Sequence, residues 1–317
     1  MPDTPPPGWL LVRVEACGIC GTDLIGAVSV RTPKAFGHEI AGTIQKVGHG
    51  VTGLENGQRV VLESASFCGR CDDCRNGRVD LCNKAPNFWG QPAMGCSEFM
   101  LAPACCAVPY EGLTPQVAAL TEPAGVAYDM VKVAGVQLGD RVCVVGPGPI
   151  GLMATALVRH AGATRLVCIG RSHSVKRLAV ARQLGAEPLA CDGSLSDLRE
   201  LGKQFDHVLM TAPPQFIPPA LSLLAYEGKL TYIGLAHGEA TITFNADDFH
   251  FRKLQLRASF ASPAVYFPRV LSLFTAGILP GQTLISHVFP LSRIADAMLT
   301  GRDDKTGTIK IVVSGAC

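Results

Sequence analysis

An apolar run that ends in a glycine-rich turn constrains the fold of this chain more than any other stretch. It reads VCVVGPGPIG over residues 142–151. An apolar strand that enters such a turn and continues as a helix is typical of a parallel-sheet α/β domain. The turn and the helix N-terminus offer backbone N–H groups to a pyrophosphate, so the stretch predicts a dinucleotide site, the alternative being a glycine-rich turn without a ligand. The predicted contacts are Gly146, Gly148, Pro149, Ile150 and Gly151.

The rhythm of the chain changes near residue 123. Before that point, short strands expected at 10–15, 41–47 and 59–62 are separated by glycines, a pattern that indicates a barrel of short strands. After it, strands and helices alternate, which favours a parallel sheet with crossover helices. The elements expected there are strands at 141–145, 166–169, 207–210 and 230–233, a helix from 149, a helix at 175–184, and an edge strand within 249–260.

The end of the second strand of this sheet indicates which dinucleotide binds. An NAD site usually has an acidic residue there for the ribose 2′-hydroxyl, whereas this chain has Gly170, Arg171 and Ser172. Arginine suits a phosphate well, and Arg177 lies close by in sequence. We therefore predict NADP, with NAD still possible; the alternative is that Arg171 lies in a solvated loop without a ligand.

Four cysteines in one loop form the strongest single metal signal. Cys68, Cys71, Cys74 and Cys82 have the spacing C-x₂-C-x₂-C-x₇-C. Four thiolates that converge on one ion form the closed tetrahedral shell of a structural zinc site. Reduced cysteines in an irregular loop are the alternative, and a redox CxxC motif is disfavoured because no strand–helix junction adjoins these residues.

A second metal site is predicted near the start of the chain. Cys20 supplies a thiolate, His38 an imidazole, and carboxylates lie nearby at Asp23 and Glu39. This mixed set suits zinc, and an open coordination position makes such a site catalytic. Alone, His38 would more often be a core or surface histidine.

Composition excludes several classes of protein. The 317 residues carry a formal net charge of +2 without a basic run, so we expect no nucleic-acid partner and no polybasic membrane anchor. The start, MPDTPPPGW, has no apolar signal region, and Gly-Pro-Gly-Pro interrupts the long uncharged stretch 142–158, which argues against a spanning helix. Thirteen cysteines without an export signal should stay reduced, so we expect a cytoplasmic protein.

Together these motifs resemble the zinc-dependent medium-chain dehydrogenase/reductase superfamily, and its sorbitol and threonine dehydrogenase branch more than its liver alcohol dehydrogenase branch. The resemblance covers most of the chain. The matching segments, in the order of the family, are GICGTD at 18–23, GHE at 37–39, the four-cysteine loop, Glu122-Pro123, the glycine turn at 146–151 and the end around 308–313.

The resemblance implies a role for each matching residue. Cys20, His38 and Glu122 would ligate a catalytic zinc ion, with Glu39 as an alternating or neighbouring ligand. Asp23 would hydrogen-bond the second nitrogen of His38, and Thr22 would relay the proton of the substrate hydroxyl. The nicotinamide would lie near Thr211, Gly234 and Leu235.

The implied reaction is hydride transfer between an alcohol and the coenzyme, with zinc polarising the hydroxyl or the carbonyl group. The implied fold is α/β: a GroES-like β-barrel catalytic domain, residues 1–123 and 264–317, and a Rossmann coenzyme domain, residues 124–263. Relatives usually begin with a β-hairpin ahead of the equivalent of Pro5, and we expect its absence here to expose a sheet edge. Two zinc ions per chain, a small alcohol or carbonyl substrate, and a homodimer or homotetramer complete the implied picture.

Two alternatives to a polyol, sugar or amino-alcohol dehydrogenase remain open from the sequence. One is a non-catalytic relative that retains the fold and the structural zinc ion. The other is a zinc-free enone or quinone reductase, which would not need Cys20, His38 and Glu122 together.

Overall fold

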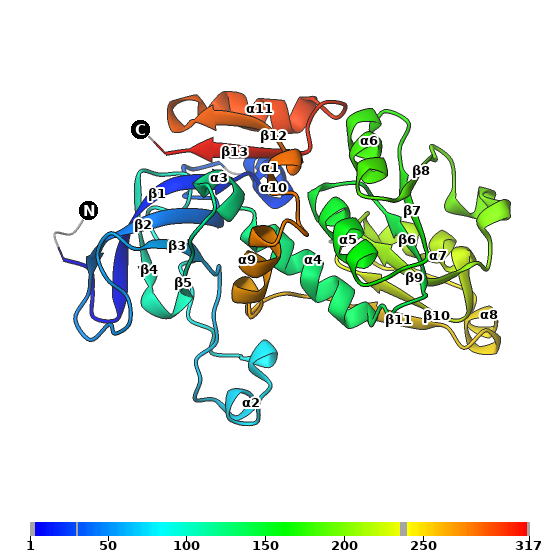
Figure 1. Cartoon of the computed structure of the whole chain (residues 1–317), viewed down its shortest axis with the longest axis horizontal. Helices are drawn as coiled ribbons and strands as arrows, with labels where there is room; N and C mark the ends of the chain where they lie inside the picture. The colour runs from blue at the N-terminus through cyan, green and yellow to red at the C-terminus, as the bar shows by residue number, and fades with distance from the viewer. Residues whose placement is uncertain (1–3, 30, 235–239, 316–317) are drawn as a thin grey trace. The chain divides into compact units, whose positions relative to one another are not determined.

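The computed structural model describes residues 4–29, 31–234 and 240–315. The chain forms two compact units, Met1–Gly125 with Ala261–Cys317, and Val126–Phe260 (Figure 1). The division after Gly125 falls inside helix α4, Thr121–Ala134, and not in a loop. The predicted division after residue 123 lies close to this point, and the separate biochemical roles of the two units stay a prediction.

The first unit contains a seven-stranded sheet in the order β12-β13-β1-β2-β3-β5, with β4 also paired to β1. Its strands are β1 (Trp9–Gly18), β2 (Glu39–Val47), β3 (Arg59–Leu62), β4 (Phe99–Pro103), β5 (Ala107–Pro109), β12 (Ile285–Pro290) and β13 (Lys310–Ser314). Its helices are α1 (Gly21–Ser29), α2 (Asp72–Arg75), α3 (Pro115–Ala118), α9 (Phe267–Thr275), α10 (Gly281–Leu284) and α11 (Ile294–Asp303), with 3-10 turns at Val79–Leu81, Ala104–Cys106 and Leu291–Arg293.

Strand β1 organises this sheet because it is long enough to pair with three neighbours. Its first half pairs with β4, its last residues pair with β13, and β2 lies antiparallel along its other side. The apolar side chains that alternate along β1 belong to a fully packed core with partners from β2 and β3. That core includes Leu10, Val12, Val14, Ile40, Ile44, Val60 and Leu62.

The second unit is a six-stranded parallel sheet in the order β11-β10-β9-β6-β7-β8. Its strands are β6 (Arg141–Val145), β7 (Arg165–Gly170), β8 (Glu187–Ala190), β9 (Phe205–Met210), β10 (Leu224–Tyr232) and β11 (Gln255–Ala258). Its helices, besides most of α4, are α5 (Pro149–His160), α6 (Val175–Gln183), α7 (Ile217–Ala220) and α8 (Ala246–Phe251), with 3-10 turns at Leu195–Asp197, Arg199–Leu201, Pro214–Phe216 and Leu221–Leu223.

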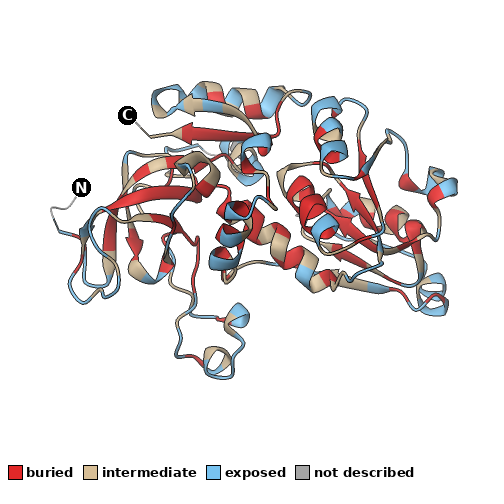
Figure 2. Ribbon diagram, viewed as in Figure 1, coloured by how far each residue is buried: buried red, intermediate tan, exposed pale blue. Residues whose placement is uncertain are grey.

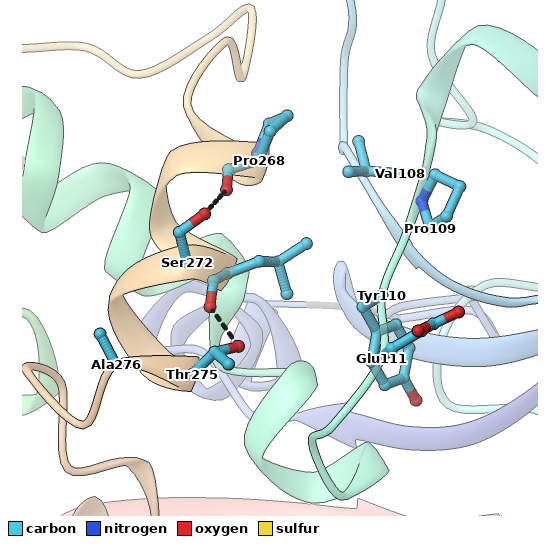
Figure 3. A pocket seen from close by; sticks show the side chains of 9 residues that line it. Val108, Pro109, Tyr110, Glu111, Pro268, Ser272, Thr275 and Ala276 are labelled. Atoms are coloured by element: carbon cyan, nitrogen blue, oxygen red, sulfur yellow. Dashed lines mark hydrogen bonds between the residues drawn. The ribbon is translucent and has the colours of Figure 1, made fainter.

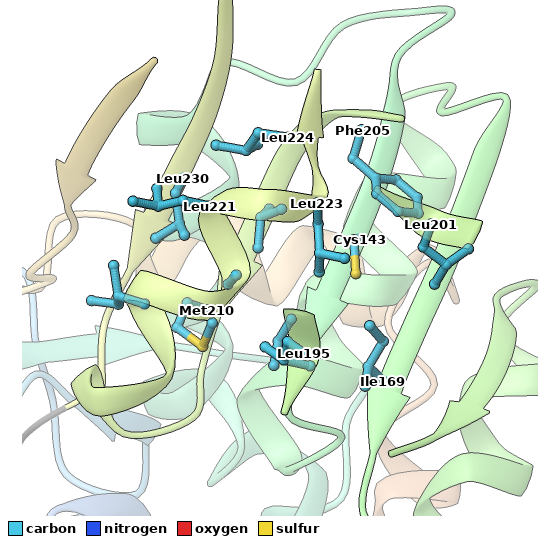
Figure 4. Close-up of a cluster of buried hydrophobic side chains, with 14 of the residues drawn as sticks. Cys143, Ile169, Leu195, Leu201, Phe205, Met210, Leu221, Leu223, Leu224 and Leu230 are labelled. Atoms are coloured by element: carbon cyan, nitrogen blue, oxygen red, sulfur yellow. The ribbon is translucent and has the colours of Figure 1, made fainter. Parts of the chain in front are cut away.

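The central strands of the parallel sheet, β6, β7 and β9, are buried along most of their length, as expected when helices cover such a sheet (Figure 2). Their side chains meet those of the following helical segments in a continuous apolar cluster (Figure 4). Cys143, Ile169, Phe205, Met210 and Leu230 are among its members. The α/β prediction, with a strand–helix alternation from residue 141, is confirmed.

One predicted element is wrong in part. The edge strand expected within 249–260 is limited to β11, because residues 246–251 form helix α8. The Asn245 side chain caps this helix by accepting a hydrogen bond from the Asp248 N–H at 3.0 Å, and Asp247 and Asp248 place negative charge in its first turn. Within the described ranges, every helix is too short or too polar to cross a bilayer.

Candidate functional site

The pairing of β1 with β2 brings the first predicted metal ligands together. Gly18, the last residue of β1, lies opposite Glu39, the first residue of β2. Cys20 follows the end of β1 and His38 immediately precedes β2, so the two side chains arise at the same edge of the sheet. A Cβ atom on Gly18 would lie 1.9 Å from Glu39 Oε2, so this approach requires glycine.

Cys20, His38 and Glu39 form one group, in which the Sγ, ring nitrogen and carboxylate oxygen atoms all lie within 4.8 Å of one another. His38 and Glu39 are buried, and Cys20 is half-buried. Glu39 Oε2 is inaccessible to water and has no hydrogen-bond partner in the described structure. A buried carboxylate oxygen without a partner is costly, and a divalent cation would satisfy it. The donor set therefore fits zinc.

Lys310 is a sequence-distant residue that contacts this group. It begins β13, is 3% exposed, and donates from Nζ to a Glu39 carboxylate oxygen and to the Ile19 carbonyl oxygen, the latter at 2.9 Å. Burial disfavours the charged amine, yet Glu39 and Cys20 outweigh this effect and raise the pKa of Lys310. Sequence reasoning missed Lys310, because the motif ending around 308–313 gave no reason to single it out.

Glu122 lies in the first turn of α4, near the same group. Its carboxylate is not within 4.8 Å of all three ligand atoms. Burial raises the pKa of Glu122 to about 8; His38 opposes this rise, and Glu39 and Cys20 add to it. One lysine thus faces two carboxylates and a thiol, which is the electrostatic setting of a cation site.

Asp23 and Thr22 begin helix α1 beside Cys20. Asp23 Oδ2 accepts a hydrogen bond from the Cys20 N–H at 2.9 Å, and its Oδ1 lies 3.7 Å from His38 Nδ1. This second distance is an ion-pair separation and is too long for the predicted hydrogen bond. Thr22 is exposed, and its hydroxyl hydrogen-bonds the Cys20 thiol.

Trp89 is a second neighbour that the sequence did not reveal. Its ring centroid lies 5.3 Å from that of His38, and the side chain is 50% exposed. Nothing in the segment around Trp89 has the spacing of a known motif, so only the folded loop shows this proximity. It gives the metal group an aromatic, partly solvent-facing neighbour.

The four-cysteine loop forms the second metal-binding group, with all four Sγ atoms within 4.8 Å of one another. Cys68 Sγ lies 4.0 Å from Cys74 Sγ, and Cys71 Sγ lies 3.9 Å from Cys82 Sγ. A tetrahedron of thiolates around zinc has sulfur–sulfur distances of about 3.8 Å. Backbone N–H groups of Arg70 and Cys71 lower the pKa of Cys68 to about 6. The loop therefore fits a closed structural zinc site.

The glycine turn adopts the geometry that a pyrophosphate needs. Gly146 has φ +105°, which favours glycine, and a Cβ atom on Gly151 would lie 1.9 Å from the Gly146 carbonyl oxygen. The space beside Gly148 is open, because a Cβ atom added there would meet nothing within 4 Å. Pro149 opens α5, a position that suits its missing N–H, and Ile150 follows it. The turn fits an anion at the N-terminus of α5.

The residues predicted to line the nicotinamide lie at the ends of β9 and β10. The Thr211 hydroxyl donates to the Val145 carbonyl oxygen at 3.1 Å and to the Gly146 carbonyl oxygen at 2.8 Å, so it supports the glycine turn. Gly234 lies so close to Ala212 that a Cβ atom would be 2.3 Å from its carbonyl oxygen. Leu235 lies outside the described residues.

The predicted 2′-phosphate residues follow β7. Gly170 packs against Pro147 of the glycine turn, where a Cβ atom would lie 2.6 Å from a ring carbon. The Arg171 guanidinium lies 5.5 Å from the centroid of the Phe216 ring, and Ser172 is exposed. Arg177 lies in the first turn of α6.

Two family models match the sequence of this chain. The alcohol dehydrogenase GroES-like domain covers residues 6–115, and the zinc-binding dehydrogenase family covers residues 149–276. The chain belongs to the zinc-dependent medium-chain dehydrogenase/reductase superfamily. It is therefore an enzyme, a zinc-dependent dehydrogenase of the alcohol dehydrogenase type that uses a nicotinamide coenzyme.

Relatives of this dehydrogenase cover most of its length. L-galactonate-5-dehydrogenase of Escherichia coli K12 is 29% identical over 90% of this chain and 86% of its own. L-arabinitol 4-dehydrogenase of Hypocrea jecorina is 29% identical over 97% and 85%.

Solved structures agree with the fold of this dehydrogenase. One is a short chain alcohol dehydrogenase from E. coli CFT073 in complex with NADH, with a TM-score of 0.88 and 25% identity over 99% of this chain and 94% of that one. Another is a zinc-binding dehydrogenase from Sinorhizobium meliloti 1021 bound to NADP, with a TM-score of 0.86 and 28% identity over 99% and 93%.

A cavity of about 490 Å³ elsewhere in the first unit of the dehydrogenase contains none of these groups. It lies between residues 108–111 and helix α9 (Figure 3). On the α9 side, the Ser272 hydroxyl donates to Pro268 and the Thr275 hydroxyl to Leu271, each at 3.0 Å. These local bonds satisfy the two hydroxyls, and the lining residues include no member of the two metal-binding groups.

Proposed function

We propose that this protein transfers a hydride between a secondary alcohol of the polyol or sugar type and NADP(H), with a catalytic zinc ion held by Cys20, His38 and a carboxylate. The observation that carries this proposal is the buried group of three unlike ligands with an unsatisfied Glu39 oxygen. Three protein ligands with room for a fourth, external ligand are typical of catalytic rather than structural zinc.

The residues of the first unit would divide the work at this site. A zinc ion there would act as a Lewis acid toward the oxygen of an alcohol or carbonyl group, and the coenzyme would exchange the hydride. Glu39 and Glu122 supply two carboxylates near one metal position, and Lys310 neutralises part of their charge. Asp23 fixes the Cys20 backbone, and the exposed Thr22 hydroxyl, already bonded to Cys20, is the group proposed to pass the substrate proton toward solvent.

The substrate class is supported by the relatives and by Trp89. The two relatives are named for L-galactonate, which is a sugar acid, and for L-arabinitol, which is a polyol. The half-exposed Trp89 ring beside His38 offers a flat apolar face of the kind that packs against the C–H groups of a sugar or polyol. An amino-alcohol remains within the proposal.

The proposal of NADP rests on the loop after β7. Gly170 removes the carboxylate that would repel a 2′-phosphate, and Arg171 and Ser172 follow it. Arg177 lies in the first turn of the adjoining helix, and the structure from S. meliloti was solved with NADP.

A substrate panel with both coenzymes tests the function, combined with metal analysis of the same preparation. We expect two zinc ions per chain, oxidation of one or more polyols or sugar acids, and a higher kcat/KM with NADP⁺ than with NAD⁺. Equal efficiency with both coenzymes would contradict the NADP assignment. One zinc ion with NADPH-dependent enone reduction would replace the proposal with an enone reductase, and two zinc ions without any turnover would indicate a non-catalytic relative.

We also propose a homodimer or homotetramer in the cytoplasm. Strand β11 is the edge of the parallel sheet, and the nearby side chains of Phe251 and Phe260 are 74% and 80% exposed. An unpaired edge beside exposed aromatic rings favours association through that edge. Light scattering of the purified protein should give at least twice the chain mass of 33.4 kDa, and a monomeric mass would contradict the proposal.

The cysteines in the described residues are free, as a reducing compartment requires.

A further inference from the structure

Asp192 contacts the loop proposed to recognise the 2′-phosphate. Strands β7 and β8 are parallel neighbours, so the residues after their carboxyl ends lie side by side. The Ser172 N–H donates to Asp192 Oδ1 at 2.9 Å, and Arg171 Nη1 donates to the Asp192 carbonyl oxygen. The Cys191 N–H donates to the Gly170 carbonyl oxygen at 2.8 Å, which joins the two segments on their backbone side.

The Asp192 carboxylate is charged and stays in solvent. Hydrogen bonds from the Ser172 hydroxyl and N–H hold its pKa below the usual range, and the positive charges of Arg171 and His173 act in the same direction. The Asp192 side chain is exposed to solvent. The Asp192 carboxylate therefore already accepts a hydrogen bond from the Ser172 N–H and lies beside the Arg171 guanidinium. These are the two groups that a coenzyme 2′-phosphate would use.

We propose that Asp192 is a specificity-determining residue that weakens binding of the coenzyme 2′-phosphate by occupying its place on the Arg171–Ser172 loop. The inference rests on the coenzyme site of the proposed function. Like charges repel, and a phosphate must also displace the carboxylate from the Ser172 N–H. Asp192 therefore reduces the ratio of affinities for NADP and NAD below the value that Arg171 alone would give.

Isothermal titration of the zinc-loaded protein with 2′,5′-ADP and with 5′-AMP separates the two parts of the coenzyme. Asp192→Asn removes the charge and keeps an oxygen for the Ser172 N–H. We expect it to bind 2′,5′-ADP about fivefold more tightly than the wild type, as expected for removal of one like charge at about 4 Å in a watery setting. Binding of 5′-AMP should not change. The gain should shrink at high salt, because exposed charges are screened, and Asp192→Glu should resemble the wild type.

Glu187→Gln is the matched control, because it removes one exposed negative charge at the opposite end of β8. It should change neither affinity. If Asp192→Asn binds 2′,5′-ADP no more tightly than the wild type, or tightens 5′-AMP equally, Asp192 only holds the loop and the inference is wrong. If the wild type binds neither nucleotide, the proposed coenzyme site itself is wrong, and the inference with it.

Discussion

Replacement of Cys20 by alanine should reduce kcat/KM by about a thousandfold or more and should lower the zinc content from two ions per chain to one. The thiol is one of three ligand groups within 4.8 Å, so its loss leaves too few donors to hold the ion. A metal Lewis acid contributes several kcal/mol to the barrier, and each ~1.4 kcal/mol is worth about tenfold in rate. Steady-state kinetics and metal analysis of the same sample measure both effects.

The control for this experiment is Cys105→Ala. Cys105 is exposed, lies in the same unit, and belongs to neither metal-binding group. It should retain both zinc ions and full activity. Binding of 2′,5′-ADP by the Cys20→Ala protein shows that the chain is folded. A Cys20→Ala protein that keeps two zinc ions, or keeps wild-type turnover, would disprove the assignment of this group as the catalytic centre.

Replacement of Lys310 by methionine should lower the free energy of unfolding of the metal-free protein by about 3–5 kcal/mol, the usual cost of leaving one partner of a buried ion pair alone. The reason is the Glu39 carboxylate, which is 1% exposed and has Lys310 as its cationic partner in the described structure. Urea unfolding of chelator-treated and zinc-loaded protein measures the loss. It should be smaller with zinc bound, since the ion can neutralise Glu39.

A double variant makes this second prediction specific. Lys310→Met combined with Glu39→Gln removes both charges, so most of the lost stability should return, at the expense of metal binding. Two losses that simply add would mean that Lys310 and Glu39 do not interact energetically. A loss below about 1 kcal/mol for Lys310→Met alone would place the pair among ordinary surface ion pairs and contradict its buried character.

The local parts of the fold were predictable because their signals are contiguous in the chain. The strand at 141–145 and the start of the helix at Pro149 match β6 and α5, since an apolar run, glycines and an N-terminal proline act over a few residues. The expected strand at 59–62 matches β3. The prediction for 249–260 was wrong only for its first residues, which belong to a helix capped by Asn245, whereas β11 forms the edge strand within the rest of the segment.

The residues that sequence reasoning missed act across long distances in the chain. Lys310 contacts Glu39 over a separation of 271 positions. Asp192 reaches Ser172 only because β7 and β8 are neighbours in the sheet. Trp89 comes from a loop without regular spacing. None of these pairings leaves a local pattern, because a lysine, an aspartate or a tryptophan at a strand end or in a loop is common in any sequence.

By itself, the sequence determined the kinds of chemistry available to this protein. The spacing of the thiolates indicates a metal such as zinc, and the glycine turn after an apolar strand indicates a dinucleotide. Both of these sequence signals depend only on residue type and short-range geometry. The tertiary structure decided which side chains lie together at one site. The register that sets Gly18 opposite Glu39 places this carboxylate within 4.8 Å of Cys20 and His38, and leaves Glu122 outside that group. Metal ligation depends on convergence within a few ångströms, which only strand pairing and the packed core provide.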